Sequence, residues 1–234
     1  MSKTSQVKEM FDSIAPAYDF MNRAMTVGVD KWWRRKAVQS VAAANPHAVL
    51  DLATGTGDLA IALARRMPTA KITGADLSPQ MLEIAHMKVQ RKGLQLNISL
   101  HEADGTALPW AEASFDAVTI AYGIRNFENI NAGYSEMYRV LKPGGTLTVV
   151  ELATPVNPVA LSFYKLYTRW LIPALGRLIS RKRRAYSYLP ESIAAVPQRE
   201  RMLELIEKAG FSRATHRPLT FGTCIIYTAS KPAT

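Results

Sequence analysis

A glycine-rich stretch at residues 50–60 (LDLATGTGDLA) is the part of the sequence best suited to ligand chemistry. Gly55 and Gly57 fit the G-x-G-x-x-G/A pattern, in which a turn between a strand and a helix approaches a nucleotide-containing ligand closely. A diphosphate prefers backbone N–H donors with no anion nearby, but here Asp51 precedes the turn and Asp58 follows it. Two carboxylates suit a ligand with an ammonium or sulfonium cation, such as S-adenosylmethionine. We therefore predict S-adenosylmethionine at this turn rather than NAD, although Asp58 by itself could equally cap the helix.

Acidic residues also stand at the ends of the next two predicted strands. Asp76 ends the second strand, nineteen residues after Gly57, where a carboxylate can accept hydrogen bonds from ribose hydroxyls. Asp104 and Gly105 end the third strand, where they can meet the edge of an adenine ring. Ligands of open α/β sheets bind beyond the carboxyl ends of the strands, so all these residues should converge on one cofactor site.

Hydrophobic periodicity predicts short strands that alternate with helices through the middle of the chain. The strands are expected at residues 47–53, 71–77, 96–103, 115–123 and 146–153, with helices at 57–67 and 78–93. A further helix begins at residue 130 and is closed by the Pro-Gly-Gly turn at 143–145. Three more helices are expected at residues 7–15, 18–25 and 31–43. This order is typical of an α/β protein whose parallel sheet is covered on both faces. Residues 211–219 and 222–231 are strand-like runs joined by a short turn, which predicts an antiparallel hairpin.

The composition fits one soluble α/β domain. The chain has 234 residues, 48% of them hydrophobic and 21% charged, which is enough to bury a full core. The lone Cys224 excludes an internal disulfide and a zinc site made of several cysteines, and we predict no metal. We find no secretory signal and no apolar run near the roughly 20 residues of a transmembrane helix, so we expect a cytoplasmic protein.

Several motifs resemble those of known methyltransferases. VLDLATGTGDLA (49–60), FDAVTIAYGIRN (115–126) and YRVLKPGGTLTVVE (138–151) look like class I methyltransferases. YDFMN (18–22), GIRN (123–126), YSYLPESI (186–193) and AGF (209–211) resemble the quinone C-methyltransferases, a family that comprises demethylmenaquinone methyltransferases and methoxy-polyprenyl-benzoquinol methylases. The similarity runs from about residue 7 to residue 231. It implies a Rossmann-like α/β sheet of seven strands, mostly parallel, with an antiparallel last strand.

The resemblance also implies an organisation and a set of site residues. It implies a single domain over residues 1–234, with a helical lid (1–44), a cofactor-binding half (45–153) and a substrate-side insertion with the C-terminal hairpin (154–234). Besides Asp76, Asp104 and Gly105, it adds Thr56 to the residues that bind S-adenosylmethionine. Two positions depart from the family pattern. Thr26 and Asp30 replace a Ser and a His, so no role of that histidine carries over. Ala53 replaces the first glycine of the wider motif, which is tolerated if its Cβ points into the turn.

The implied reaction moves a methyl group from a sulfonium to a ring carbon of a polyprenyl quinol. An aromatic carbon is a poor nucleophile until its neighbouring hydroxyl loses its proton, so the site must favour the phenolate. Arg125 is the first candidate for this task, because a guanidinium stays protonated and offers several donors. Asn126 could orient the hydroxyl or cap the next helix. Tyr18 and Asp19 on the N-terminal lid complete the catalytic candidates, and either Asp19 or Asp30 could accept the proton.

An aromatic-rich helix is expected after the fifth strand, within residues 159–179. For most of its residues we favour a core position, and the alternative is a groove for the polyprenyl tail. The aromatic and apolar residues concerned are Phe163, Tyr164, Tyr167, Trp170 and Leu171. The net charge of +10 is concentrated in residues 31–36 and 177–184. The second run, from Arg177 to Arg184, could rest on anionic membrane at the inner face, and the other interpretation of both runs is a solvated helix face.

Other functions fit the residues less well. An RNA methyltransferase is disfavoured, because AYGIRN (121–126) lacks the prolines that enzymes methylating base nitrogens carry after strand four, and Cys224 is misplaced for carbon methylation. We therefore expect no nucleic-acid partner. An NAD-dependent reductase is weakened by Asp51 and the terminal hairpin. A catalytically silent partner in a quinone-biosynthesis assembly stays open, and so does a homo-oligomer. Overall resemblance favours demethylmenaquinol over a benzoquinol as the substrate.

Overall fold

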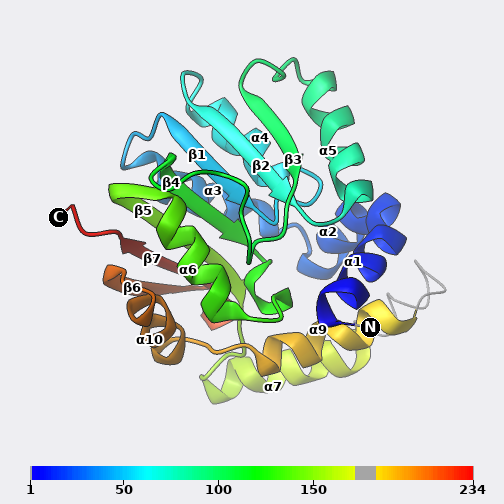
Figure 1. Ribbon diagram of the computed structural model, residues 1–234. Coiled ribbons are helices and arrows are strands. Elements are labelled where there is room, and N and C mark those ends of the chain that lie inside the picture. The colour runs from blue at the N-terminus through cyan, green and yellow to red at the C-terminus, as the bar shows by residue number, and fades with distance from the viewer. Residues whose placement is uncertain (1, 172–182, 234) are drawn as a thin grey trace.

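The computed structural model describes residues 2–171 and 183–233 and shows a seven-stranded sheet (Figure 1). The strand order is β3-β2-β1-β4-β5-β7-β6. Strands β1 to β5 are parallel, and β7 pairs antiparallel with both β5 and β6. The predicted α/β fold and the antiparallel end of the sheet are therefore confirmed. The strands are β1 (Ala48–Leu52), β2 (Lys71–Asp76), β3 (Ile98–Glu102), β4 (Phe115–Ala121), β5 (Leu141–Leu152), β6 (Ser212–Leu219) and β7 (Cys224–Ser230).

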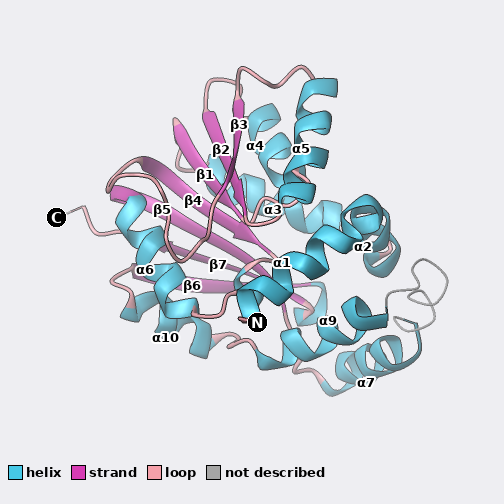
Figure 2. Cartoon of the chain, turned by 45° about the vertical axis from the view of Figure 1, so that its right-hand side comes forward, coloured by secondary structure: helices cyan, strands magenta, loops and turns pink. Residues whose placement is uncertain are grey.

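Helices cover both faces of this sheet (Figure 2). Helices α3 (Asp30–Ala42), α4 (Asp58–Arg66) and α5 (Pro79–Arg91) lie on one face, where Trp33 and Leu63 belong to the buried core. Helices α6 (Ile130–Val140) and α10 (Glu200–Lys208) lie on the other face, where Tyr134 and Met202 are buried. Because both faces are covered, the central strands bury side chains on both sides, as their near-continuous apolar runs predict.

The N-terminal helices α1 (Lys3–Ile14) and α2 (Tyr18–Thr26), joined by the turn η1 (Ala15–Ala17), lie at the carboxyl ends of the parallel strands (Figure 2). The Nζ of Lys3 donates to the carbonyl oxygen of Phe127 at 2.8 Å, beyond β4. Lys8 pairs with Glu102 at the end of β3, with 2.7 Å between the charged atoms. These contacts hold α1 across the strand ends, where the sequence places the cofactor site.

Strand β5 begins earlier than the sequence predicts. A helix from residue 130 that a Pro-Gly-Gly turn at 143–145 closes is expected, but α6 ends at Val140 and β5 starts at Leu141, before that turn. The segment 142–145 (KPGG) forms an irregularity inside this strand, because the pairing with β4 shifts between Leu141 and Thr146. A Cβ on Gly145 would lie 2.8 Å from the carbonyl oxygen of Lys142. The glycine therefore allows the chain to turn directly from helix into strand.

The insertion after β5 is not a core helix. Helix α7 (Pro158–Leu166) and the π-helical turn η3 (Tyr167–Leu171) are followed, beyond residues 172–182, by α9 (Arg183–Ala195). No residue of α7 is buried in the described structure, and Phe163 is 69% exposed, so the core position favoured for it is wrong. The side chains of Trp170 and Leu171 and those of the basic run 177–184 lie outside the described part.

Among the helices formed by residues 2–171 and 183–233, none combines the length and the apolar character needed to cross a bilayer. The same residues contain no group of three His, Cys, Asp or Glu side chains placed to hold a metal ion. The charged residues that matter for the site instead gather beside the glycine-rich turn and at the end of β5, as described next.

Candidate active site

The turn between β1 and α4 uses its two glycines for different purposes. Both have a positive φ, +56° at Gly55 and +78° at Gly57, which side chains rarely adopt. A Cβ on Gly57 would lie 3.1 Å from the Cβ of Ala85, so this glycine lets α4 and α5 pack closely. A Cβ on Gly55 would instead point toward the ring of Tyr18, 4.0 Å away. Gly55 borders two adjoining cavities, whereas Gly57, although predicted to bind the cofactor, lines neither of these two.

Ala53 shows how the chain tolerates the loss of a motif glycine. Its φ is +52°, a left-handed value that costs an alanine about 1–2 kcal/mol. A Cβ built on Gly123 would lie only 2.5 Å from the Cβ of Ala53. The alanine therefore fits because the residue that faces it across the strand ends, Gly123, has no side chain.

The smaller cavity, with a volume of about 100 Å³, lies between the strand ends and α1. Asp76 and Asp104 line it from β2 and from the loop after β3, and Phe11 lines it from α1. Asp76 accepts hydrogen bonds from two backbone N–H groups, that of Gly55 at 2.8 Å and that of Ser78 at 2.9 Å. Burial raises the pKa of Asp76 although these two bonds act to lower it. A carboxylate has about four acceptor sites, so Asp76 can still accept a hydrogen bond from a ligand.

Gly105 is a point of close approach in the same cavity. A Cβ at this position would lie 2.3 Å from the Cζ of Phe127, so only glycine leaves that ring in place. Its neighbour Asp104 accepts hydrogen bonds through Oδ1 from the N–H of Thr106 at 2.8 Å and from the hydroxyl of Thr106 at 2.7 Å. The loop after β3 is thereby fixed with Asp104 and Gly105 together at the cavity wall.

The larger cavity, about 500 Å³, lies between the glycine-rich turn and the insertion after β5. Tyr18 and Gly55 line both cavities, so the two adjoin. Tyr164 and Tyr167 from the insertion are half-buried and line the larger cavity. The remaining predicted residues on its wall are Asp19, Asp51, Thr56, Asp58 and Arg125.

Asp51 is a buried carboxylate on β1 that forms no ion pair within the described residues. The hydroxyl of Thr54 donates to its Oδ2 at 2.6 Å. Burial is the largest influence on this group and raises its pKa to about 7, against the opposing effect of the Thr54 hydrogen bond. A cation brought next to Asp51 would remove much of this penalty, because it stabilises the ionised carboxylate.

Arg125 forms a buried ion pair that the sequence does not reveal. It lies in the short 3₁₀ turn η2 (Ile124–Asn126) after β4, and its Nη1 is 2.7 Å from Oε1 of Glu151, which is 1% exposed at the end of β5. Nη1 also donates to the carbonyl oxygen of Tyr122. Burial opposes the charge of Arg125, but Glu151 outweighs it and raises the pKa. The Nε of Arg125 is buried without a hydrogen-bond partner among the described residues.

Tyr18 interacts electrostatically with this arginine, and Asn126 follows it in the chain. Burial raises the pKa of Tyr18, while a hydrogen bond with Asn22 and the charge of Arg125 act to lower it. The Oδ1 of Asn126 accepts a hydrogen bond from the hydroxyl of Tyr188 at 3.0 Å. Asn126 lines the smaller cavity and does not cap α6, because that helix is capped by the side chain of Asn129.

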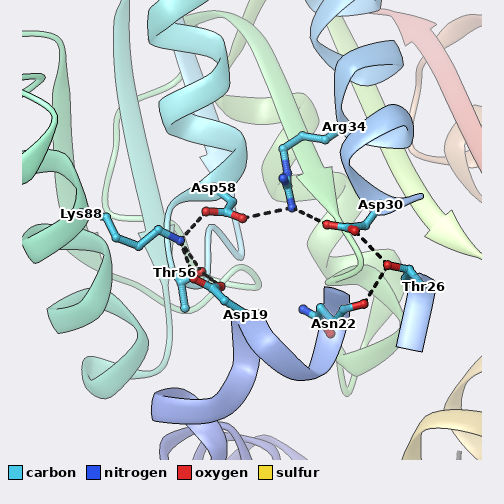
Figure 3. Close-up of polar contacts among 8 residues, drawn as sticks. All are labelled: Asp19, Asn22, Thr26, Asp30, Arg34, Thr56, Asp58 and Lys88. Atoms are coloured by element: carbon cyan, nitrogen blue, oxygen red, sulfur yellow. Dashed lines mark hydrogen bonds and ion pairs between the residues drawn. The ribbon is translucent and has the colours of Figure 1, made fainter. Parts of the chain in front are cut away.

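A cluster of ion pairs fastens α2 to the glycine-rich turn (Figure 3). The Nζ of Lys88, from α5, lies 2.8 Å from Oδ2 of Asp19 and 3.1 Å from the hydroxyl of Thr56, and it also pairs with Asp58. The hydroxyl of Thr56 donates to Oδ1 of Asp19 at 2.6 Å. Both oxygens of Asp19 therefore accept hydrogen bonds from the protein, which makes it an anchor for α2.

The same cluster continues to α3 through Asp58 (Figure 3). Arg34 lies 3.2 Å from Asp58 and 3.2 Å from Asp30, whose other oxygen accepts from the hydroxyl of Thr26 at 2.8 Å. Burial acts against ionisation of Asp58, but Arg34 and Lys88 outweigh it and lower the pKa. Of the two carboxylates beside the turn, Asp58 already has protein cations as partners, and Asp51 is the one left for a cationic ligand.

Sequence reasoning missed Glu151 and Lys88. Glu151 stands at the carboxyl end of β5, so the rule that identifies Asp51, Asp76 and Asp104 would also have identified it. Lys88 lies in a helix that also contains Arg91, and no local signal distinguishes the two.

Residues 1–231 match the ubiE/COQ5 methyltransferase family. The chain is 45% identical to a demethylmenaquinone methyltransferase from Bacteroides fragilis, over 98% of this chain and 94% of that protein. It is 40% identical to a protein from Geotalea daltonii named ubiquinone/menaquinone biosynthesis C-methyltransferase, over 98% of this chain and 97% of that one. The crystal structure of the [4+2]-cyclase SpnF superimposes over 100% of this chain and 97% of its own, with a TM-score of 0.75 and 18% identity, which shows the shared fold.

Proposed function

The chain belongs to the ubiE/COQ5 methyltransferase family, and from this premise we propose that it transfers a methyl group from S-adenosylmethionine to a ring carbon of a polyprenyl quinol. Demethylmenaquinol is the substrate that we favour, because the relative from Bacteroides fragilis carries that activity in its name. A benzoquinol is the alternative, since the name of the Geotalea daltonii relative includes ubiquinone biosynthesis. The observation that carries the proposal is a large cavity that adjoins the glycine-rich turn and has Arg125, the partner of the buried Glu151, in its wall.

The residues at the turn suit S-adenosylmethionine. Asp51 is a buried carboxylate without an ion-pair partner in the described chain, so it can pair with the cation of a ligand. Asp76 keeps lone-pair capacity for a ribose hydroxyl, and Gly105 lets the ring of Phe127 pack beside it in the wall of the smaller cavity. When bound, this cofactor supplies an electrophilic methyl group. We propose that Gly55, Thr56, Asp104 and the helix that follows the turn complete its site, with Asp58 acting through its ion pairs.

Arg125 would favour the phenolate form of the quinol. Arg125 lines the larger cavity, so its guanidinium brings a positive charge to the wall where negative charge would develop on a ring hydroxyl. Glu151 holds the guanidinium by Nη1 and so fixes its orientation. Tyr18, which lines both cavities, would position the ring, and Asn126 would hold Tyr188 in place. The ion pairs of Asp19 leave it less suited to accept a proton than the sequence suggested.

The insertion after β5 would house the polyprenyl tail. Tyr164 and Tyr167 are half-buried on the cavity side of α7 and η3, and Leu189 and Ile193 of α9 line the same cavity. An apolar chain packed against such side chains is removed from water, which favours binding. The groove that was the less favoured sequence interpretation is thus the one that we propose. Contact between residues 177–184 and anionic membrane stays a prediction.

Methyl transfer to a short-chain demethylmenaquinol tests this function directly. The purified chain is incubated with S-adenosylmethionine carrying a labelled methyl group and with the reduced naphthoquinol or the matching benzoquinol. We expect label in the naphthoquinol ring, at a rate that exceeds the rate with the benzoquinol. The reverse order would assign the protein to benzoquinol methylation.

A catalytically silent role in a quinone-biosynthesis assembly is the competing proposal. It predicts S-adenosylmethionine binding without label in either quinol. The matched control is the Arg125→Lys variant, which keeps the charge but loses the planar fork. If the proposal is right, this variant binds the cofactor with nearly unchanged affinity and turns over far more slowly.

A further inference from the structure

Helix α7 presents apolar side chains on two sides, yet buries none of them in the described structure. One side lines the larger cavity with Tyr164, and Tyr167 continues that lining from η3. Val159, Phe163 and Leu166 follow an i, i+4, i+7 spacing, so they share a face, and all three are exposed. An exposed helix in a water-soluble protein normally places polar residues on its outer face. The outer face of α7 therefore has the character of a contact surface.

Exposed apolar side chains from two other elements stand at the mouth of the same cavity. Val27, the C-cap residue after α2, is 80% exposed, and Phe221 in the turn η4 (Thr220–Gly222) is 84% exposed. Both line the larger cavity, as does Phe163. Side chains that are largely exposed and still border a cavity mark its opening. We call Val27, Val159, Phe163, Leu166 and Phe221 the apolar rim.

The three segments that carry the apolar rim contain charge of one sign only. Residues 20–29, 153–171 and 219–224, which carry the rim, contain no Asp or Glu, although the chain has 19 acidic residues. The same segments contain three exposed basic residues, Arg23, Lys165 and Arg169. Exposed apolar side chains together with exposed cations are the combination that binds an anionic lipid surface, and the nearby Asp19 and Asp30 are already paired with Lys88 and Arg34.

We propose that the apolar rim inserts into the surface of an anionic bilayer and places the mouth of the larger cavity against the membrane. The rim side chains bury at the boundary between headgroups and acyl chains, while Arg23, Lys165 and Arg169 face the lipid phosphates. The purpose of this docking rests on the proposed function, because a polyprenyl quinol dissolves in the bilayer and enters the cavity without crossing water. The docking itself does not depend on turnover.

A second copy of the chain is a less suitable occupant. Two apolar rims placed face to face bring the same three cations of each copy together, and like charges repel. Such a contact also closes both cavity mouths. A bilayer satisfies the cations and leaves the mouth open to an apolar ligand.

Vesicle binding by the full chain tests the proposal. The chain is sedimented with vesicles of phosphatidylcholine alone or of phosphatidylcholine and phosphatidylglycerol in equal parts. The test variant is Val159→Ser with Leu166→Ser, two exposed positions outside the cavity lining. The matched control is Met87→Ser with Leu96→Ser, which removes two exposed apolar side chains remote from the rim, on α5 and in the loop before β3.

We expect binding to the anionic vesicles, weakened at least about tenfold in the rim variant and unchanged in the control, because each lost apolar contact reduces partitioning. Methylation of a short-chain quinol in solution should persist in the rim variant. Equal vesicle binding by the rim variant and the wild type would overturn the proposal, and so would a wild type that ignores anionic vesicles. A concentration-dependent dimer that the rim variant abolishes would assign the rim to a second copy. Vesicle binding without methyl transfer would leave the docking intact and refute the proposed function instead.

Discussion

The pKa of Asp51 predicts how the stability of the ligand-free protein changes with pH. Burial raises this pKa from its ordinary 3.8 to about 7. Between these values the folded chain keeps a proton on Asp51 that the unfolded chain has released. The folded state therefore binds more protons, and the free energy of unfolding falls as the pH rises through this window.

The size of the effect follows from the pKa shift. One pKa unit corresponds to about 1.36 kcal/mol, so the full shift is on the order of 4 kcal/mol. Asp51 is 1% exposed, so solvent screening removes little of this value. The Asp51→Asn variant cannot titrate at this position, and its stability should lack this component. The substitution itself can change the free energy of unfolding by a constant amount, which is read at pH 4. Relative to that value, we expect the free energy of unfolding of the variant to rise above that of the wild type by up to about 4 kcal/mol at pH 8.

Urea unfolding of both proteins at a series of pH values measures this difference, and other titrating groups cancel in the comparison. Asp116→Asn is the matched control. Burial acts to raise the pKa of Asp116, but hydrogen bonds from Lys142 and from two backbone N–H groups lower it. This control should therefore lose stability relative to the wild type above the ordinary pKa of an aspartate, the opposite sign to Asp51→Asn. A constant difference between wild type and Asp51→Asn from pH 4 to pH 8 would refute the reasoning.

Cofactor binding provides a second readout of the same group. If the cation of S-adenosylmethionine lies beside Asp51, it lowers the pKa of that carboxyl, and a proton leaves on binding near pH 6.5. Titration calorimetry in two buffers of different ionisation enthalpy detects this proton. We expect a binding enthalpy that depends on the buffer for the wild type but not for Asp51→Asn. A buffer-independent enthalpy for the wild type would place the ligand cation elsewhere.

Three further variants test the site. Arg125→Met leaves Glu151 buried without its partner and should lower the free energy of unfolding by about 3–5 kcal/mol. Adding Glu151→Leu should recover part of this loss, and thermal unfolding of the single and double variants measures both effects. In Arg125→Lys, turnover should fall roughly 10²–10³-fold at nearly constant cofactor affinity, and near-normal turnover would contradict the role of Arg125. Asp76→Ala should weaken S-adenosylmethionine binding by about 1.5–3 kcal/mol in calorimetry, and unchanged affinity would count against Asp76 as a ligand. Gly55→Val should abolish that binding in a chain whose circular dichroism stays native, because a branched residue resists φ of +56° and fills the cavity edge.

The order of elements and much of the site could be predicted from the sequence, because both follow from local patterns. Alternating strands and helices give a parallel sheet, and a short turn between the last two strands gives the antiparallel hairpin that the structure confirms. The rule that ligands meet the carboxyl ends of strands placed Asp51, Asp76 and Asp104 at adjoining cavities. The same rule applied to β5 points to Glu151, so this residue could also have been predicted from the sequence.

Only the tertiary structure decided which of these residues have partners. Asp51 and Asp58 look alike beside the same turn, but Asp58 meets Arg34 and Lys88 from two other helices, and Asp51 points into the interior. Ala53 is tolerated because Gly123, seventy residues away, lacks a side chain. Such pairings depend on how helices and strands far apart in the chain pack against each other. Ion pairing, burial and pKa are set by these distances in space, whereas local periodicity sets only the elements that carry the residues.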